Sequence, residues 1–165
     1  MKGAANAMKL VRFLYNGREQ YGDLQADTIR LLDGALDTGF TPSDKCAARA
    51  DVRLLAPVRP SKAVCIGLNY MDHIIESHEK VPTSPVVFIK PSTAVIGPGG
   101  RIVYPAQSKR VDYEGELAIV IGRRAKNVPE HEAASHILGY TCANDVTARD
   151  LQPSDGQWSV AKGFD

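Results

Sequence analysis

The chain has 165 residues, of which 44% are apolar and 24% are charged, a composition typical of a globular protein with a buried core. Lysine and arginine nearly balance aspartate and glutamate, 20 against 19, so no charge surplus indicates nucleic acid as a partner. The apolar runs are too short to span a bilayer, and residues 1–7 lack the apolar core of a signal peptide. Three scattered cysteines favour a reducing compartment. We therefore expect a cytoplasmic protein without a membrane partner.

The first part of the chain, residues 1–53, is expected to form a small β-rich lobe. Its strand-like runs cover residues 9–15, 21–24 and 28–32, with a turn at Asn16-Gly17 after the first run. Residues 35–50 are mixed in character and are expected to include one short helix. Met8 is a candidate native start, in which case residues 1–7 are an expression scar.

A second lobe, residues 54–165, is expected after the prolines at positions 57 and 60, because proline interrupts helices and strands. The expected strands of this lobe cover residues 63–66, 86–89, 113–121 and 138–146. The expected helices run from Asn69 to about residue 80 and from Pro129 to about residue 136. The last residues, Trp158–Phe164, look like the entry to another core element, so we expect the chain to stop inside a fold. The pattern favours an α+β or mainly β fold.

Two glutamates open the most apolar strand of the sequence. Residues two apart in a strand face the same side, so Glu114 and Glu116 share a face. Because the rest of the strand is apolar on both faces, we expect it to be buried, where two like charges would repel and lose hydration. A hard divalent cation would remove both costs, since it prefers carboxylate oxygens. A solvated strand end remains an equal alternative.

Four other residues can be interpreted either as functional residues or as ordinary structural or surface residues. Asp145 ends an apolar strand, where it is either a third metal ligand or, on spacing alone, a helix cap. His73 and Glu76 share a helix face, where a carboxylate bound to one ring nitrogen makes the other a base. An exposed polar pair is the commoner case. Lys162 either extends to the surface or points inward, where it must meet carboxylates or an anionic substrate.

Several motifs together resemble the fumarylacetoacetate hydrolase family, and they occur in the order found in that family. These motifs are Gly67-Leu68-Asn69-Tyr70-Met71-Asp72-His73 followed by Glu76, Phe88-Ile89-Lys90-Pro91-Ser92, Tyr113-Glu114-Gly115-Glu116-Leu117, the run from Asn144 to Gln152, and Trp158 to Phe164. The resemblance covers about residues 54 to 165. The core of that family continues beyond these motifs, so its mixed β-roll catalytic domain is expected to be incomplete here.

The resemblance implies a site for Mg²⁺ or Mn²⁺, with Ca²⁺ as a substitute. The implied metal ligands are Glu114, Glu116 and Asp145, the implied catalytic residues are His73, Glu76 and Lys162, and the implied substrate contacts are Arg149, Gln152 and Tyr70. It also implies a homodimer that acts in aromatic catabolism.

The implied activity is that of a metal-dependent hydrolase, which cleaves a C–C bond in a small acylpyruvate or 1,3-dioxo acid through a metal-held enolate. An isomerase of the 2-hydroxyhepta-2,4-diene-1,7-dioate type or an oxaloacetate-type decarboxylase would use the same enolate and the same residues. A non-catalytic module that is only stabilised by its metal is an alternative of another class. His73 with Glu76 discriminates between these classes, because a structural metal site has no use for a base.

Overall fold

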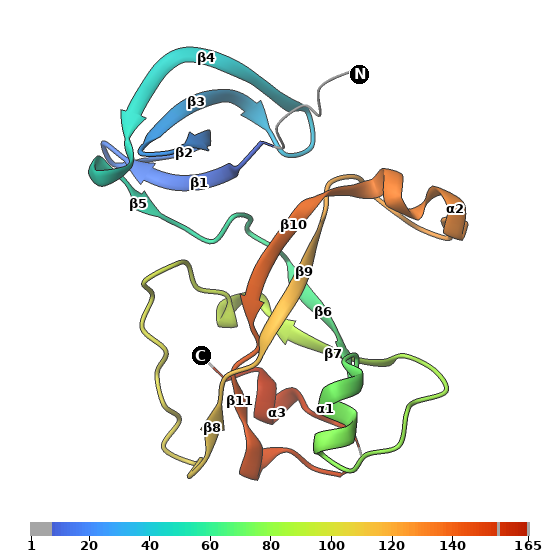
Figure 1. Ribbon diagram of the computed structural model, residues 1–165. Coiled ribbons are helices and arrows are strands. Elements are labelled where there is room, and N and C mark those ends of the chain that lie inside the picture. The colour runs from blue at the N-terminus through green and yellow to red at the C-terminus, as the bar shows by residue number, and fades with distance from the viewer. Residues whose placement is uncertain (1–7, 155, 165) are drawn as a thin grey trace. The chain divides into compact units, whose positions relative to one another are not determined.

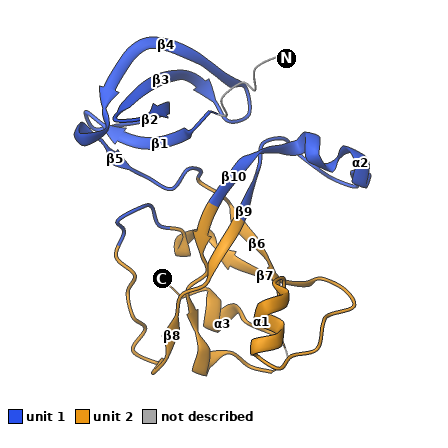
Figure 2. Cartoon of the chain, viewed as in Figure 1, with its two compact units in different colours: residues 1–58, 96–100, 118–141 blue, residues 59–95, 101–117, 142–165 orange. Residues whose placement is uncertain are grey.

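The computed structural model describes residues 8–154 and 156–164, so the expectation for residues 1–7 lies outside the described residues. The chain divides into two compact units, which are coloured separately in Figure 2. The first unit comprises residues 1–58, 96–100 and 118–141, and the second comprises residues 59–95, 101–117 and 142–165.

An antiparallel sheet in the strand order β4-β3-β2-β1-β5 makes up most of the first unit (Figure 1). Its strands are β1 (Leu10–Tyr15), β2 (Arg18–Gln25), β3 (Thr28–Ala35), β4 (Gly39–Ala48) and β5 (Arg53–Leu54). The turn between β1 and β2 is formed by Asn16 and Gly17, which have φ values of 50° and 72°. Two successive positive φ angles are what a two-residue hairpin requires, and asparagine and glycine tolerate them best. Phe13 and Ile29 are fully buried at the centre of this sheet's core.

The helix expected within residues 35–50 is wrong, because most of these residues form β4. This strand pairs with β3 and lies at the edge of the sheet, with Pro42 opposite Leu32. An edge position tolerates proline, since one side of the strand needs no backbone N–H donor. Pairing with the free edge of β3 therefore outweighs the local turn tendency of the sequence. A 3₁₀ turn at Arg49–Asp51 follows the strand.

Two longer strands, β9 (Gly115–Ile121) and β10 (Ile137–Asn144), form a two-stranded sheet, and each has residues in both units. Between them lie α2 (Glu130–Ala133) and a 3₁₀ turn at Ala134–His136. The expectation that β9 is buried on both faces is wrong. Leu117, Ile119 and Ile121 on one face are exposed, because β9 pairs only with β10 and no described residue covers that face.

The second unit combines two short strand pairs with two short helices. Its strands are β6 (Lys62–Gly67) with β7 (Val86–Pro91), and β8 (Val111–Asp112) with β11 (Thr147–Ala148). Its helices are α1 (Met71–Glu76) and α3 (Ser159–Lys162), with 3₁₀ turns at Ser92–Ala94 and Arg149–Leu151. Helix α3 contacts β7, β11 and the turn at Arg149–Leu151, all within the orange unit of Figure 2.

The helix α1 is shorter than expected. It begins after Tyr70, rather than with Asn69 as its cap, and its hydrogen bonds end near His78, whose φ of 56° is incompatible with a continuing helix. The fold as a whole is mainly β, with small antiparallel sheets and few helices, which confirms the expected fold class. None of the helices in the described part of the chain is long and apolar enough to cross a membrane.

Candidate functional site

The carboxylates of Glu114 and Asp145 lie on neighbouring backbone segments of the second unit. The backbone N–H of Asp145 donates to the carbonyl oxygen of Glu114 at 2.9 Å, and the N–H of Glu114 donates to Oδ1 of Asn144 at 3.0 Å. The antiparallel pairing continues where Thr147 lies opposite Asp112 in β11 and β8. This pairing places two acidic side chains, far apart in sequence, beside each other.

The ammonium group of Lys162 lies between these two carboxylates. Its Nζ donates to Oε2 of Glu114 at 2.7 Å and to Oδ2 of Asp145 at 2.8 Å. The lysine side chain is only 4% exposed, and its Nζ also lies 5.1 Å from the ring centroid of Phe88. Lys162 therefore points inward, where the two carboxylates compensate the loss of hydration.

A second lysine, Lys90 of β7, binds the other oxygen of Asp145. Its Nζ donates to Oδ1 of Asp145 at 2.6 Å and to the carbonyl oxygen of Val146 at 3.2 Å. The side chain of Lys90 is 12% exposed and that of Asp145 is 7% exposed. Asp145 is thus held from both sides by ammonium groups and is not a helix cap.

Arg149 holds Glu114 on the side opposite Lys162. Its Nη2 donates to Oε1 of Glu114, its Nε donates to Oδ2 of Asp112 at 2.9 Å, and its Nη1 donates to Oε1 of Gln152 at 3.1 Å. The resemblance implies substrate contacts for Arg149 and Gln152; here Arg149 binds Glu114, and Gln152 binds Arg149. Hydrogen bonds from Arg110 and then from Arg149 lower the pKa of Asp112 below its usual range.

We call Glu114, Asp145, Lys90, Arg149 and Lys162 the carboxylate cluster. Every carboxylate oxygen of its two acidic residues accepts a hydrogen bond from a cationic side chain. The hydroxyl of Thr147, which is fully buried, also lies 3.1 Å from Oε1 of Glu114. Charge-assisted hydrogen bonds of this kind are stronger than neutral ones, so the two acidic groups have defined positions.

The oxygen donors of the cluster fit a hard divalent cation. Glu114 and Asp145 already point one oxygen each at a common positive charge, and such cations prefer carboxylate oxygens. The third expected ligand, Glu116, is partly buried but makes no described contact with either residue. Within residues 8–154 and 156–164, no group of three or more His, Cys, Asp or Glu residues is arranged to hold a metal ion. The three-carboxylate site stays a prediction.

The proposed catalytic dyad lies on α1. The side chains of His73 and Glu76 are exposed, and no hydrogen bond joins them in the described structure. Tyr70 is the residue just before α1. Its hydroxyl oxygen accepts a hydrogen bond from the backbone N–H of Leu117 at 3.1 Å. This contact anchors the start of α1 to the strand that carries Glu116. The roles of His73 and Glu76 as base and orienting group stay predictions.

Lys90, Asp112 and Thr147 belong to the site but were not predicted from the sequence. Asp112 lies two residues before Glu114, as Glu114 lies two before Glu116, so the alternation of a strand could have placed it on the same face. Lys90 follows the buried Phe88 on the same face of β7, and a lysine on a buried face requires a carboxylate partner. Thr147 had no comparable signal.

The inner face of β6 adds a thiol beside the cluster. Cys65 lies opposite Phe88 in the strand pairing. Burial raises the pKa of this thiol, and the negative charge of Asp145 raises it further. Cys65 is therefore a neutral packing residue at physiological pH.

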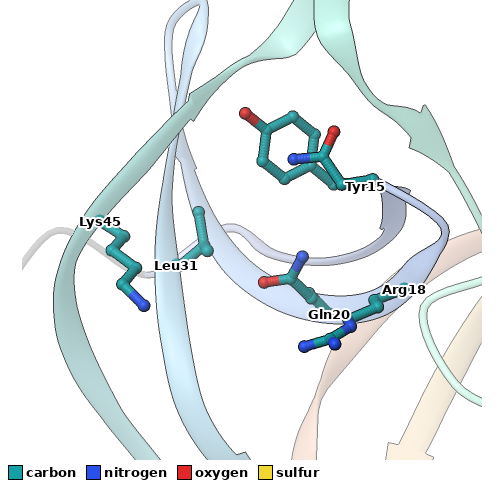
Figure 3. A pocket seen from close by; sticks show the side chains of 6 residues that line it. Tyr15, Arg18, Gln20, Leu31 and Lys45 are labelled. Atoms are coloured by element: carbon teal, nitrogen blue, oxygen red, sulfur yellow. The ribbon is translucent and has the colours of Figure 1, made fainter.

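The first unit contains a separate, open recess of about 410 Å³ on its sheet (Figure 3). It is lined by Tyr15, Asn16, Arg18, Gln20, Leu31 and Lys45. This lining contains no carboxylate and no histidine, so it offers neither a ligand for a hard cation nor a general base. The candidate chemistry therefore lies in the second unit.

Comparison with known proteins agrees with this location. A family model described as fumarylacetoacetate hydrolase C-terminal matches residues 62–165, and a model described as Rv2993c-like, N-terminal matches residues 8–57. A protein of undefined function from Archaeoglobus fulgidus is 51% identical over 94% of this chain and 59% of its own length. A mitochondrial oxaloacetate tautomerase from Xenopus laevis is 45% identical over 83% of this chain and 45% of its own length.

A solved structure has the same fold. The 2-hydroxyhepta-2,4-diene-1,7-dioate isomerase from Mycobacterium marinum superposes with a TM-score of 0.84 at 41% identity, over 96% of this chain and 62% of its own. The chain thus spans less than two thirds of each of these relatives. The family model covers most of the chain, and the resemblance inferred from the motifs is confirmed. The chain belongs to the fumarylacetoacetate hydrolase family.

Proposed function

We propose that the protein is a divalent-metal-dependent enzyme that moves a proton between the keto and enol forms of a small 2-oxo dicarboxylic acid. The observation that carries this proposal is the convergence of Glu114 Oε2 and Asp145 Oδ2 on one cation position, at 2.7 and 2.8 Å from Lys162 Nζ. The names of two relatives, an oxaloacetate tautomerase and a hydroxydienoate isomerase, support it, since each describes a shift of one proton in such an acid.

Glu114, Asp145 and Glu116 would hold the cation, which would polarise the 2-oxo group of the substrate and acidify the neighbouring C–H bond. Lys162 supplies a buried positive charge beside these carboxylates, and it can stabilise an oxygen that becomes negative. Arg149 and Lys90 keep the two carboxylates oriented. In this proposal these residues bind and orient, and the proton is transferred by another group.

His73 would transfer the proton. Its exposed imidazole lies on α1, next to the Tyr70 contact that fixes the start of this helix. Imidazole exchanges protons readily near neutral pH, so its ring nitrogen can accept the proton from the enol oxygen or from carbon and return it elsewhere. Glu76, one turn later, would orient the ring when a substrate is bound.

A second candidate is hydrolysis of a C–C bond in an acylpyruvate or 1,3-dioxo acid, as the resemblance to the family first implied. The description of the matching family model, fumarylacetoacetate hydrolase, favours this candidate. In that reaction His73 would take a proton from water rather than from the substrate. The two candidates therefore differ in whether water enters the product.

A substrate comparison tests the proposal. The enol form of oxaloacetate, a 2-hydroxydienoate and an acylpyruvate are each mixed with the protein and Mg²⁺ or Mn²⁺, and ¹H NMR identifies the products. We expect faster ketonisation with no cleavage, and we expect EDTA to abolish the effect. Cleavage of the acylpyruvate alone would replace the proposal with the second candidate, and no turnover of any substrate would refute both.

A further inference from the structure

Lys162 is paired with the same carboxylates that the proposed function assigns to the cation. Its Nζ donates to Glu114 and Asp145 at 2.7 and 2.8 Å. A divalent cation would bind the same two oxygens at about 2.1 Å. The sum of these lengths places such a cation no farther than about 5 Å from the ammonium if the lysine stays. Two positive charges at this separation in a buried site repel strongly.

We propose that Lys162 is a built-in counter-cation, which neutralises Glu114 and Asp145 when no metal is bound and must leave both when a divalent cation binds. The proposal rests on the proposed function for its metal site, and it adds an exchange of one cation for another. The balance of charge in the cluster supports this exchange, because each of the two acidic residues still has one cationic partner after Lys162 has left. Lys90 remains at Oδ1 of Asp145, and Arg149 remains at Oε1 of Glu114.

Two consequences follow from this exchange. The metal-free protein holds its two ligands in place, because a shared ammonium prevents the carboxylates from repelling each other. The same ammonium opposes the metal, so it lowers the affinity of the site. Once displaced, it becomes a free positive charge beside the cluster, where an anionic substrate can use it.

The experiment compares Mn²⁺ binding by the protein and three variants, measured by calorimetry and by electron paramagnetic resonance. Lys162→Met removes the competing charge, Lys162→Arg keeps it, and Lys62→Met removes an exposed lysine of β6 as the matched control. We expect Lys162→Met to bind Mn²⁺ about tenfold more tightly or better, because a nearby positive charge no longer opposes the ion. Lys162→Arg and Lys62→Met should show no such tightening.

The outcomes separate this proposal from the proposed function. If the wild-type protein binds Mn²⁺ and Lys162→Met binds it equally or more weakly, the counter-cation is refuted while the metal site stands. If none of the proteins binds Mn²⁺, the metal site and the counter-cation are both refuted. If Lys162→Met does not fold without metal, Mn²⁺ should restore its circular dichroism, and failure to do so at concentrations that saturate the wild type would overturn the proposal.

A second measurement follows the ammonium itself. In ¹H–¹⁵N spectra of lysine side chains, the hydrogen-bonded Nζ of Lys162 should give a slowly exchanging signal without metal, identified by its absence in Lys162→Arg. Addition of diamagnetic Mg²⁺ should remove or shift this signal and leave that of Lys90 in place. An unchanged Lys162 signal at saturating Mg²⁺ would refute the exchange.

Discussion

Asp145 has a different lysine at each oxygen of its carboxylate, Lys162 at Oδ2 and Lys90 at Oδ1. Only 7% of its side chain is exposed, so both lysines bind it away from bulk water. The two lysines have separate tasks in our proposals. Lys162 can leave, whereas Lys90 keeps the orientation of Asp145 by also binding the carbonyl oxygen of Val146. A carboxylate with one permanent and one exchangeable cation can accept a metal without losing its position.

We predict that Lys90→Met lowers the free energy of unfolding by about 1 to 3 kcal/mol, because it leaves a buried acceptor of Asp145 without a partner. Urea denaturation measures this change. Lys62→Met, at an exposed position on the neighbouring strand β6, is the control and should lie within about 0.5 kcal/mol of the wild type. An equally small change in Lys90→Met would contradict its role at Asp145.

His73→Ala should lower turnover by about 10²-fold, the usual effect of removing a positioned acid–base group. Mn²⁺ affinity and the melting temperature should be unchanged, because the side chain is exposed and makes no described contact with the cluster. Steady-state kinetics and calorimetry separate these effects. His131→Ala, at another exposed histidine, should leave turnover unaffected. Wild-type turnover in His73→Ala would show that the base lies elsewhere.

Asp150 predicts a pH dependence of stability. The hydroxyl of Ser108 donates to its Oδ1 at 2.6 Å, and the N–H of Lys109 donates to its Oδ2 at 2.7 Å. These bonds, the Ser108 bond most, lower the pKa of Asp150 below its ordinary value of 3.8. A lowered pKa means that the stabilisation is complete above the unfolded-state value and is lost as the pH falls through the folded-state value.

We therefore expect Asp150→Asn to melt at a lower temperature than the wild type at pH 7. The difference should narrow as the pH falls below about 4, because the wild-type carboxylate then becomes protonated. Melting curves at a series of pH values measure it. A difference that stayed constant between pH 7 and pH 3 would show that the charge of Asp150 does not contribute.

At the scale of secondary structure, the contact between α1 and β9 decides how the dyad helix is held. Helix α1 has six residues, and its first turn has no side-chain cap. A helix this short has little stability of its own, so it depends on tertiary contacts. The hydrogen bond from Leu117 N–H to the Tyr70 hydroxyl is the described polar contact that joins its start to a strand.

Tyr70→Phe should loosen α1 without unfolding the unit. We expect faster hydrogen exchange of the Leu117 amide, which loses its acceptor, and a smaller loss of turnover than in His73→Ala. Exchange measured by NMR tests the first expectation. Tyr104→Phe, at an exposed tyrosine of the same unit, is the control. Unchanged Leu117 exchange would mean that the hydrogen bond does not hold the helix.

The sequence predicted elements whose signals are local. The Asn16-Gly17 turn, the apolar strand at Val86 and the helix after Pro129 each follow from residues within one element. The prediction from sequence failed at β4, because this strand is formed by pairing with the edge of β3, which local sequence signals do not reveal. It also failed for the exposed face of β9, since an apolar strand does not reveal what covers it.

The sequence predicted several residues of the candidate site, but it did not predict which residues bind to one another there. The motifs named Glu114, Asp145 and Lys162, and the structure brings these three together. Lys90, which binds Asp145, comes from β7, a strand that contains no acidic residue. Such partners depend on tertiary packing, which residue spacing does not encode.

At the scale of the whole molecule, the two units differ in how their contacts relate to sequence. The sheet of the first unit is mostly a succession of hairpins, in which each strand from β1 to β4 pairs with the next. The second unit relies on two-stranded pairs, which are marginal alone and need packing against helices. Helix α3, through its contacts with β7 and β11, supplies part of that packing.

The ion pairs of the cluster span long stretches of chain, and this has a consequence for the order of folding. Lys90 and Asp145 are 55 residues apart, and Glu114 and Lys162 are 48 apart. Closing loops of this length costs entropy before any contact forms, whereas neighbouring hairpins such as β1–β2 close cheaply. We expect the first unit's sheet to form early and the cluster to assemble late. An unfolded chain then has no paired carboxylates to offer, so a divalent cation at the proposed site would bind the native state selectively and would slow its unfolding.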